Sequence, residues 1–147
     1  MEDMSSQKKQ CRWLGIDFGE RRIGLAITDE LLIMAKPYRV IDVKKENPIS
    51  AIKKIVRENN VCLIVIGNPL HLSGDESELS LKVKEFKRHL ESMIEGIEIV
   101  LYDERFTSRM AERMLASRGI DLRKSREQID IYAATFLLEE YLERNRP

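Results

Sequence analysis

The run VCLIVIG at residues 61–67 limits the possible folds more than any other part of the chain. It contains only apolar residues and glycine, without the polar–apolar alternation of a half-exposed strand. A short run of this kind is typical of a strand that is covered on both faces. It is far too short to cross a bilayer, so no membrane partner is expected. We therefore expect a layered α/β domain built around this strand.

The other segments surround this strand in the order βββαβαβαα. The predicted strands are 12–18, 22–29, 38–43, 61–67 and 97–104, and the predicted helices are 48–58, 76–94, 107–117 and one that begins with the capping box at Ser125–Gln128. Strands joined by short turns are expected to be antiparallel neighbours, whereas strands reached through helices pair in parallel. The prediction is a mixed five-stranded sheet, three antiparallel strands then two parallel, with helices on both faces.

The length and composition fit one domain. The chain has 147 residues, 43% hydrophobic and 34% charged, which suffices for a single core at residues 12–147. Residues 1–11 are expected to form a disordered leader. The two cysteines, Cys11 and Cys62, are too few for a disulfide framework, and Cys62 is interpreted as a small core residue. This cysteine usage favours a reducing, cytoplasmic location.

Three acidic residues lie where a charge is costly to bury. Asp17 is near the end of the first predicted strand, Glu104 ends the last strand, and Asp130 lies in the first turns of the final helix. A buried acid needs an ion-pair partner or a bound cation. If the three acids converge, their oxygens suit Mg²⁺ or Mn²⁺. Two such ions can promote hydrolysis of a phosphodiester.

Each acid also has a simpler interpretation. Asp17 could accept hydrogen bonds from the amides of a turn, and Asp130 could interact with the dipole of its helix. Asp103 and Glu104 are adjacent, so they point to opposite faces of an extended strand. The strand is apolar on both sides, and its pattern does not tell which acid joins Asp17. Both could instead cap the next helix.

Basic residues are concentrated between two of these acids. The chain has 25 basic and 25 acidic residues, so its net charge gives no sign of a nucleic-acid partner. Residues 105–126 nevertheless contain seven basic and two acidic residues, a net charge of +5. This excess fits contacts to a phosphate backbone, or equally a solvated surface. Arg21 and Arg22 could bind phosphate or face solvent, and His71 is more simply a surface histidine.

Four sequence motifs follow one another between residues 12 and 144. They are GIDFGERRIGLAITD, VIGNPLHLSG, YDERFTS and IDIYAATFLLEEYL. Together they resemble the YqgF family, also called RuvX, of the RNase H-like superfamily. Each stretch alone is weakly specific, whereas four in order are quite specific. Phe106 and Ser108 stand where Leu and Thr are common in the family, and neither change affects the acidic residues.

The resemblance implies an RNase H-like fold and a metal-dependent nuclease site. The catalytic and metal-binding residues that it implies, by matching motif, are Asp17, Glu104 and Asp130, with Arg22 and Arg105 near the substrate. Asp17 would bridge two Mg²⁺ or Mn²⁺ ions, and each of the other acids would hold one. From the charge pattern we add Arg109 and Arg113, four residues apart, as contacts to the phosphate backbone.

The family is associated with maturation of the 5′ end of 16S ribosomal RNA and with resolution of Holliday junctions. The expected substrate is therefore pre-rRNA, with branched DNA as the alternative. A ribosome-assembly factor that binds nucleic acid with little catalysis is a third possibility. The stretch IDFGERRIG also resembles the phosphate loop of actin-like ATPases, but those need a second domain to enclose the nucleotide. The residues do not distinguish RNA from DNA, endonuclease from exonuclease, or monomer from homodimer.

Overall fold

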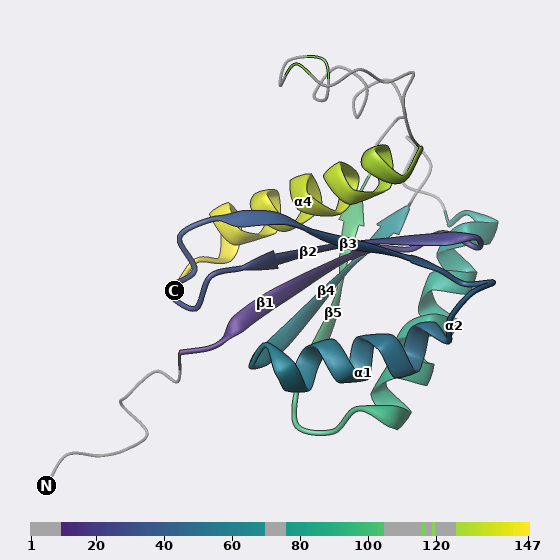
Figure 1. Cartoon of the computed structure of the whole chain (residues 1–147), viewed down its shortest axis with the longest axis horizontal. Helices are drawn as coiled ribbons and strands as arrows, with labels where there is room; N and C mark the ends of the chain where they lie inside the picture. The colour runs from purple at the N-terminus through teal and green to yellow at the C-terminus, as the bar shows by residue number, and fades with distance from the viewer. Residues whose placement is uncertain (1–9, 70–75, 105–115, 117–118, 120–125) are drawn as a thin grey trace, which may run out of the picture.

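The computed structural model describes residues 10–69, 76–104, 116, 119 and 126–147. Five strands form one sheet in the order β3-β2-β1-β4-β5 (Figure 1). The strands are β1 (Arg12–Asp17), β2 (Arg22–Thr28), β3 (Ala35–Asp42), β4 (Val61–Pro69) and β5 (Glu98–Glu104). The β1–β2 and β2–β3 pairs are antiparallel, and the β1–β4 and β4–β5 pairs are parallel. The predicted mixed sheet is confirmed.

Helices cover both faces of the sheet, as predicted. α1 (Pro48–Glu58) and α2 (Glu78–Met93) lie on one face, and α4 (Arg126–Asn145) lies on the other (Figure 1). The predicted helix at 107–117 falls outside the described residues, apart from Ala116. None of the described helices is long and apolar enough to cross a bilayer.

The central strand β4 shows why its sequence lacks alternation. Ile64 and Ile66 are fully buried in the cluster formed with α1 and α2, while Leu63 and Val65 are buried in the cluster formed with α4. Both sets are apolar because each faces a helical layer. The expectation that residues 61–67 form a strand covered on both faces is confirmed, and β4 continues to Pro69.

The predicted helices at 48–58 and 76–94 are also found, the second as Glu78–Met93. The side chain of Asn47 caps α1 by accepting a hydrogen bond from the backbone N–H of Ser50 at 3.1 Å, and Pro48 occupies the first turn. Ser77 caps α2 in the same way, accepting from the N–H of Ser80 at 3.0 Å. A polar cap followed by an apolar stripe therefore sets both starts.

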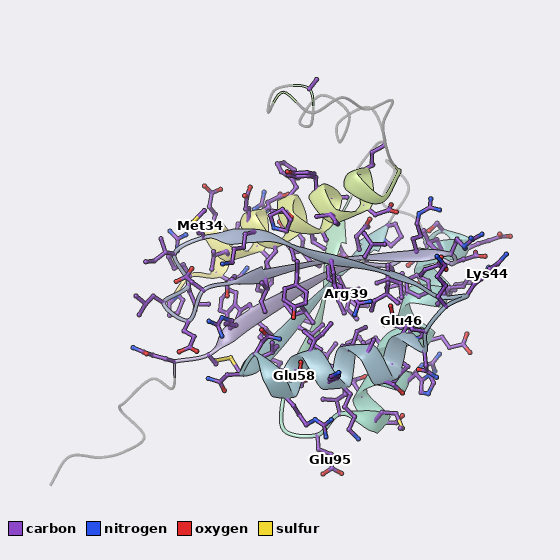
Figure 2. The ribbon with its side chains drawn as sticks, viewed as in Figure 1. Met34, Arg39, Lys44, Glu46, Glu58 and Glu95 are labelled. Carbon is purple, nitrogen blue, oxygen red and sulfur yellow. A yellow bond between two sulfur atoms is a disulfide. The ribbon has the colours of Figure 1, made fainter. Side chains whose placement is uncertain are left out.

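Strand β3 is longer than predicted. It begins at Ala35 rather than residue 38, and Pro37 lies inside it, opposite Ala26 at a shift in the β2–β3 register. Proline is tolerated there because β3 is an edge strand, where a missing N–H leaves no inner strand unpaired. Arg39 of this strand forms an ion pair with Glu46 in the turn that follows (Figure 2).

Gly19 lies in the turn between β1 and β2. Its φ is not positive, so it does not need a backbone conformation forbidden to larger residues. Its requirement is space, since a Cβ atom at this position would lie 2.4 Å from the carbonyl oxygen of Arg22. Glycine thus allows the tight turn between β1 and β2.

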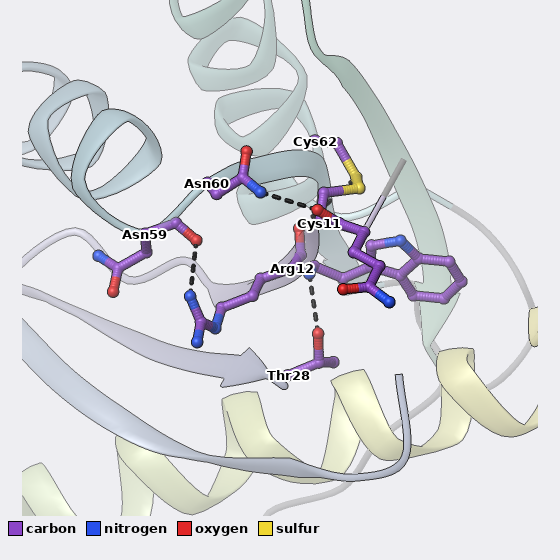
Figure 3. Close-up of a disulfide and its surroundings, with 8 residues drawn as sticks. Cys11, Arg12, Thr28, Asn59, Asn60 and Cys62 are labelled. Carbon is purple, nitrogen blue, oxygen red and sulfur yellow. Dashed lines mark hydrogen bonds between the residues drawn. A yellow bond between two sulfur atoms is a disulfide. The ribbon is translucent and has the colours of Figure 1, made fainter. Parts of the chain in front are cut away.

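The structure corrects the interpretation of the cysteines. Cys11 and Cys62 form a disulfide, with their Cα atoms 5.8 Å apart (Figure 3). Parallel pairing of β1 with β4 sets Arg12 opposite Val61, which brings the neighbouring cysteines together. The sequence does not reveal this register between distant strands. Cysteine usage therefore no longer supports a reducing compartment.

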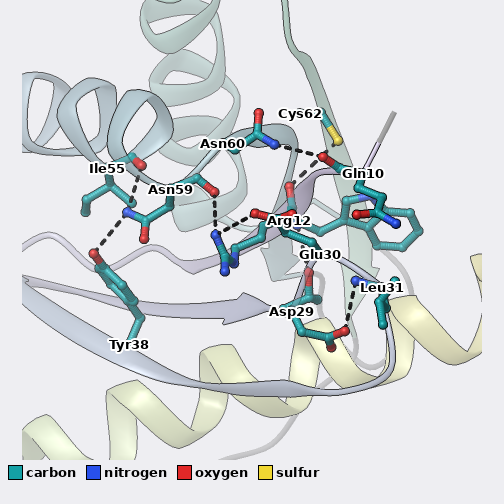
Figure 4. Close-up of polar contacts among 12 residues, drawn as sticks. Gln10, Arg12, Asp29, Glu30, Leu31, Tyr38, Ile55, Asn59, Asn60 and Cys62 are labelled. Atoms are coloured by element: carbon teal, nitrogen blue, oxygen red, sulfur yellow. Dashed lines mark hydrogen bonds and ion pairs between the residues drawn. The ribbon is translucent and has the colours of Figure 1, made fainter. Parts of the chain in front are cut away.

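The start of the described chain is tied to the end of α1. The carbonyl of Gln10 accepts a hydrogen bond from the side chain of Asn60 at 2.8 Å (Figure 4). The guanidinium of Arg12 donates to the carbonyl of Asn59 at 3.1 Å and pairs with Glu30 at 3.3 Å. Gln10, which lies inside the segment that we assigned to the leader, therefore contacts the folded domain.

Reduction of the disulfide is expected to lower the free energy of unfolding by roughly 2–4 kcal/mol. The bond joins residues 51 apart in the sequence, so it restricts a long loop of the unfolded chain. Urea denaturation before and after treatment with a phosphine reductant measures the difference. A Cys11→Ser/Cys62→Ser variant serves as the control, because reductant should leave it unchanged. Identical midpoints for oxidised and reduced wild type would contradict the prediction.

Candidate active site

The candidate site lies where β1, β4 and β5 end, at one edge of the sheet. These strands are mutually parallel, so their last residues, Asp17, Pro69 and Glu104, come to the same edge. Carboxyl ends of parallel strands are a common place for ligand sites in α/β sheets. The first turns of α4 bring Asp130 to this edge from the other end of the sequence.

Gly24 allows α4 to lie close enough to deliver Asp130. It is the partner of Asp17 in the β1–β2 ladder. A Cβ atom at Gly24 would lie 2.1 Å from the backbone carbonyl oxygen of Asp130, which is far inside van der Waals contact. Gly24 was not among the predicted site residues, although a glycine within a strand often marks a close backbone approach.

Asp17 and Asp130 interact electrostatically. Burial, and to a smaller extent the negative charge of Asp130, raise the pKa of Asp17 to about 7 from its ordinary value of 3.8. Within the described part of the chain, no hydrogen bond reaches the Asp17 carboxylate. Asp17 is therefore a poorly compensated acid that a cation would stabilise in its ionised form.

Arg22 contacts the second of these acids. Its Nε atom donates to Asp130 at 2.9 Å, and both side chains are half-buried. We predicted Arg22 near the substrate, and the structure places its guanidinium beside one of the predicted ligands. Arg21 instead approaches Asp42, at 3.5 Å, on the neighbouring edge strand.

The contacts of β5 bear on the choice between Asp103 and Glu104. The carboxylate of Asp103 accepts a hydrogen bond from Asn68 at 2.9 Å, and Asn68 is bonded to the buried Ser80 of α2. Asp103 therefore belongs to the face covered by α1 and α2. Tyr102 belongs to the opposite face, because its hydroxyl hydrogen bonds to Glu140 of α4 at 3.1 Å. Strict alternation assigns position 104 to the α4 face, with position 17.

The described residues fit a divalent cation in part. Among the side chains that the structure describes, no group of three or more His, Cys, Asp or Glu residues is arranged to hold a metal. Two carboxylates are present, Asp17 and Asp130, and carboxylate oxygens are ligands that Mg²⁺ and Mn²⁺ prefer. The structure does not describe Ser125, His71, Arg105, Arg109 or Arg113. It also does not describe the side chains of Glu104 and of residues 126–128.

The raised pKa of Asp17 predicts that metal-free protein loses stability as pH rises from about 4 to about 7. Between its ordinary value of 3.8 and the folded value of about 7, the folded state binds the proton more tightly than the unfolded state. Stability is thus greatest at low pH within this window and falls by up to about 1.4 kcal/mol per pH unit. Urea denaturation in EDTA at several pH values measures this, and a flat or rising profile relative to Asp17→Asn would contradict it.

Comparison with known sequences identifies relatives along nearly the whole chain. Residues 11–144 match the family model RuvX, described as Holliday junction resolvase. A protein of Syntrophus aciditrophicus is 40% identical over 133 residues, which is 90% of this chain and 88% of the relative. One from Sulfurihydrogenibium is 38% identical over 134 residues, 90% of each chain. Both carry the name "Putative pre-16S rRNA nuclease".

Comparison with solved structures identifies the same fold. The structure of T. thermophilus RuvC in complex with a Holliday junction substrate has a TM-score of 0.54 and 15% sequence identity, covering 91% of this chain and 95% of RuvC. A second Thermus thermophilus RuvC structure gives a TM-score of 0.53. At this identity the similarity concerns the fold alone, and it confirms the predicted RNase H-like architecture. By its sequence match, the chain belongs to the RuvX family, described as Holliday junction resolvases.

Proposed function

We propose that this RuvX-family protein is a divalent-metal-dependent nuclease that matures the 5′ end of pre-16S ribosomal RNA in the cytoplasm. The observation that carries the proposal is the proximity of the Asp17 carboxylate to the like-charged carboxylate of Asp130. Burial of an acid beside a like charge costs stability, and such arrangements are concentrated at functional sites. The substrate is suggested by the names of relatives 38–40% identical to this chain.

Asp17, Glu104 and Asp130 would hold Mg²⁺ or Mn²⁺ at the end of the sheet, with Asp17 as the shared ligand. When bound, such ions supply activation of water and stabilisation of the leaving oxygen of a phosphodiester. Asp17 is half-buried, and no residue in the described part of the chain donates a hydrogen bond to its carboxylate, which suits its oxygens to a cation. We favour Glu104 over Asp103 because Asp103 is engaged with Asn68 on the other face.

Arg22 would serve the site in two ways. Its ion pair with Asp130 offsets one of the two negative charges and orients that carboxylate. A guanidinium also binds phosphate oxygens through parallel N–H groups, which lysine cannot match. Arg22 is thus suited to contact a phosphate of the substrate beside the acids. Arg105, the residue after Glu104, would be a second such contact.

Replacement of Arg109 and Arg113 by Ala is expected to weaken nucleic-acid binding to many sequences about equally. Binding to phosphates releases counterions, so the log–log slope of affinity against salt should decrease by roughly one unit for each arginine that no longer binds a phosphate. Fluorescence anisotropy with a labelled RNA at several salt concentrations measures the slope. The control is Lys53→Ala/Arg57→Ala, an equally spaced and exposed pair on α1. Unchanged affinity and slope would show that residues 105–126 are only a solvated surface.

Cleavage of a substrate panel tests the proposed function. Purified protein is incubated with a 5′-extended pre-16S rRNA fragment, single-stranded DNA and a four-way DNA junction, each with Mg²⁺, Mn²⁺ or EDTA. We expect cleavage of the rRNA fragment that requires metal. Metal-dependent cleavage of the junction alone would favour the second candidate, Holliday junction resolution, which the family description supports. Tight binding without cleavage by either metal would indicate an assembly factor.

A further inference from the structure

A buried polar cluster lies directly behind the candidate site, on the opposite face of the sheet. Asn68, the penultimate residue of β4, is 5% exposed, and Ser80 of α2 is fully buried. Both polar atoms of the Asn68 side-chain amide form hydrogen bonds. Its oxygen accepts a hydrogen bond from the Ser80 hydroxyl at 2.6 Å, and its nitrogen donates to the Asp103 carboxylate at 2.9 Å. Each buried polar group is therefore satisfied.

This cluster fixes the last residues of β5 to β4 and α2. Asn68 and Asp103 are partners in the β4–β5 ladder, so their side-chain bond joins adjacent strands one residue before Glu104. The next pair is Pro69 with Glu104, and proline has no N–H to give to the ladder. The Ser77 hydroxyl donates to the Pro69 carbonyl at 2.6 Å, which fixes the end of β4 to the start of α2. Side chains therefore secure the strand end where backbone bonding is incomplete.

The two adjacent acids at the end of β5 could each face the site, and this cluster determines which one does. Asp103 and Glu104 are adjacent acids, and a shift of one residue in strand register exchanges the faces to which they belong. We propose that Asn68 is a positioning residue for the nuclease site, because it binds Asp103 on the α2 face and so assigns position 104 to the α4 face. This inference rests on the proposed function, in which Glu104 is a metal ligand.

An exchange of the two partners tests the proposal. Asn68→Asp replaces the donor with a second carboxylate, which should repel Asp103 and loosen the strand end. We expect Mn²⁺ affinity, measured by titration calorimetry, to fall about tenfold or more, the size of effect seen when the support around a metal site is lost, because Glu104 directly follows Asp103. Asp103→Asn should retain Mn²⁺ binding, because its amide oxygen still accepts from Asn68. The double variant Asn68→Asp/Asp103→Asn re-creates the pair in the reverse direction and should restore binding.

Two further variants keep the test decisive. If Asn68→Asp does not fold, Ser80→Ala removes the bond that anchors the Asn68 amide, and it should weaken Mn²⁺ binding in the same direction. Lower melting temperatures with unchanged Mn²⁺ affinity would overturn the proposal, as would failure of the double variant to recover binding. Glu104→Gln separates the two proposals. If it leaves Mn²⁺ binding intact, the proposed ligands are wrong; if it abolishes binding while Asn68→Asp and Ser80→Ala do not, only the positioning role fails.

Discussion

Asp17→Asn is expected to reduce cleavage by more than about a hundredfold, the upper range seen when even outer-sphere partners of a metal are removed. The same change should raise the melting temperature of metal-free protein at pH 8, because it removes a half-buried charge that Asp130 repels. At pH 5, where Asp17 is protonated, the gain should disappear. Cleavage assays and thermal melts in EDTA at both pH values measure these effects.

Asp29 provides a matched control for this substitution. Burial alone would raise the pKa of Asp29, but hydrogen bonds from the backbone N–H groups of Met34, Ile33 and Leu31 hold it below its ordinary value. Asp29→Asn should therefore lower the melting temperature and leave cleavage intact. Substantial cleavage by Asp17→Asn, with contaminating nuclease excluded, would refute the catalytic role. A lower melting temperature for Asp17→Asn would indicate a structural role instead.

Gly24→Ala is expected to have the largest effect on the fold and to inactivate the site as well. The added methyl group would meet the carbonyl oxygen of Asp130 at 2.1 Å, so β2 and α4 must move apart. Overpacking of this kind costs about 1–3 kcal/mol and sometimes more. Because the displaced segment carries Asp130, Mn²⁺ affinity should fall in protein that is still folded. Urea denaturation and Mn²⁺ titration below the unfolding temperature measure the two effects.

Gly96→Ala separates loss of stability from loss of the site. Gly96 has a φ of +82° and open space around it, so alanine there is strained but touches nothing. Both glycine variants should lose stability, while only Gly24→Ala should lose Mn²⁺ binding. Equal Mn²⁺ affinity in the two variants would mean that the close approach of α4 is not what positions Asp130.

The fold was largely predictable because its signals are local. The continuous apolar run at 61–67, the short turn between the first two strands and the cap at Asn47 each act over a few residues, and connection lengths then fix which strands pair in parallel. Edge strand β3 was placed less well, because Pro37 is usually a break and only its position at the sheet edge permits it.

The candidate site was predictable in its residue types and less so in its arrangement. An acid at a strand end can be recognised in the sequence, but the approach of Asp130 to Asp17 depends on how α4 packs over Gly24. The choice between Asp103 and Glu104 depends on a hydrogen bond from Asn68, thirty-five residues away. The disulfide was not predicted for the same reason, because the register between strands that are distant in sequence leaves no local pattern.

The position of α4 has a consequence for synthesis of the protein. The two acids that interact come from β1 and from α4, the first strand and the last helix in chain order. A chain emerging from the ribosome can pair all five strands before α4 exists, but Asp17 then lacks the Asp130 carboxylate beside it. Until α4 docks, the sheet face that carries Trp13 and Val65 is also uncovered. The pair of acids is thus complete only after α4, the last described helix, has been synthesised and has docked on the sheet.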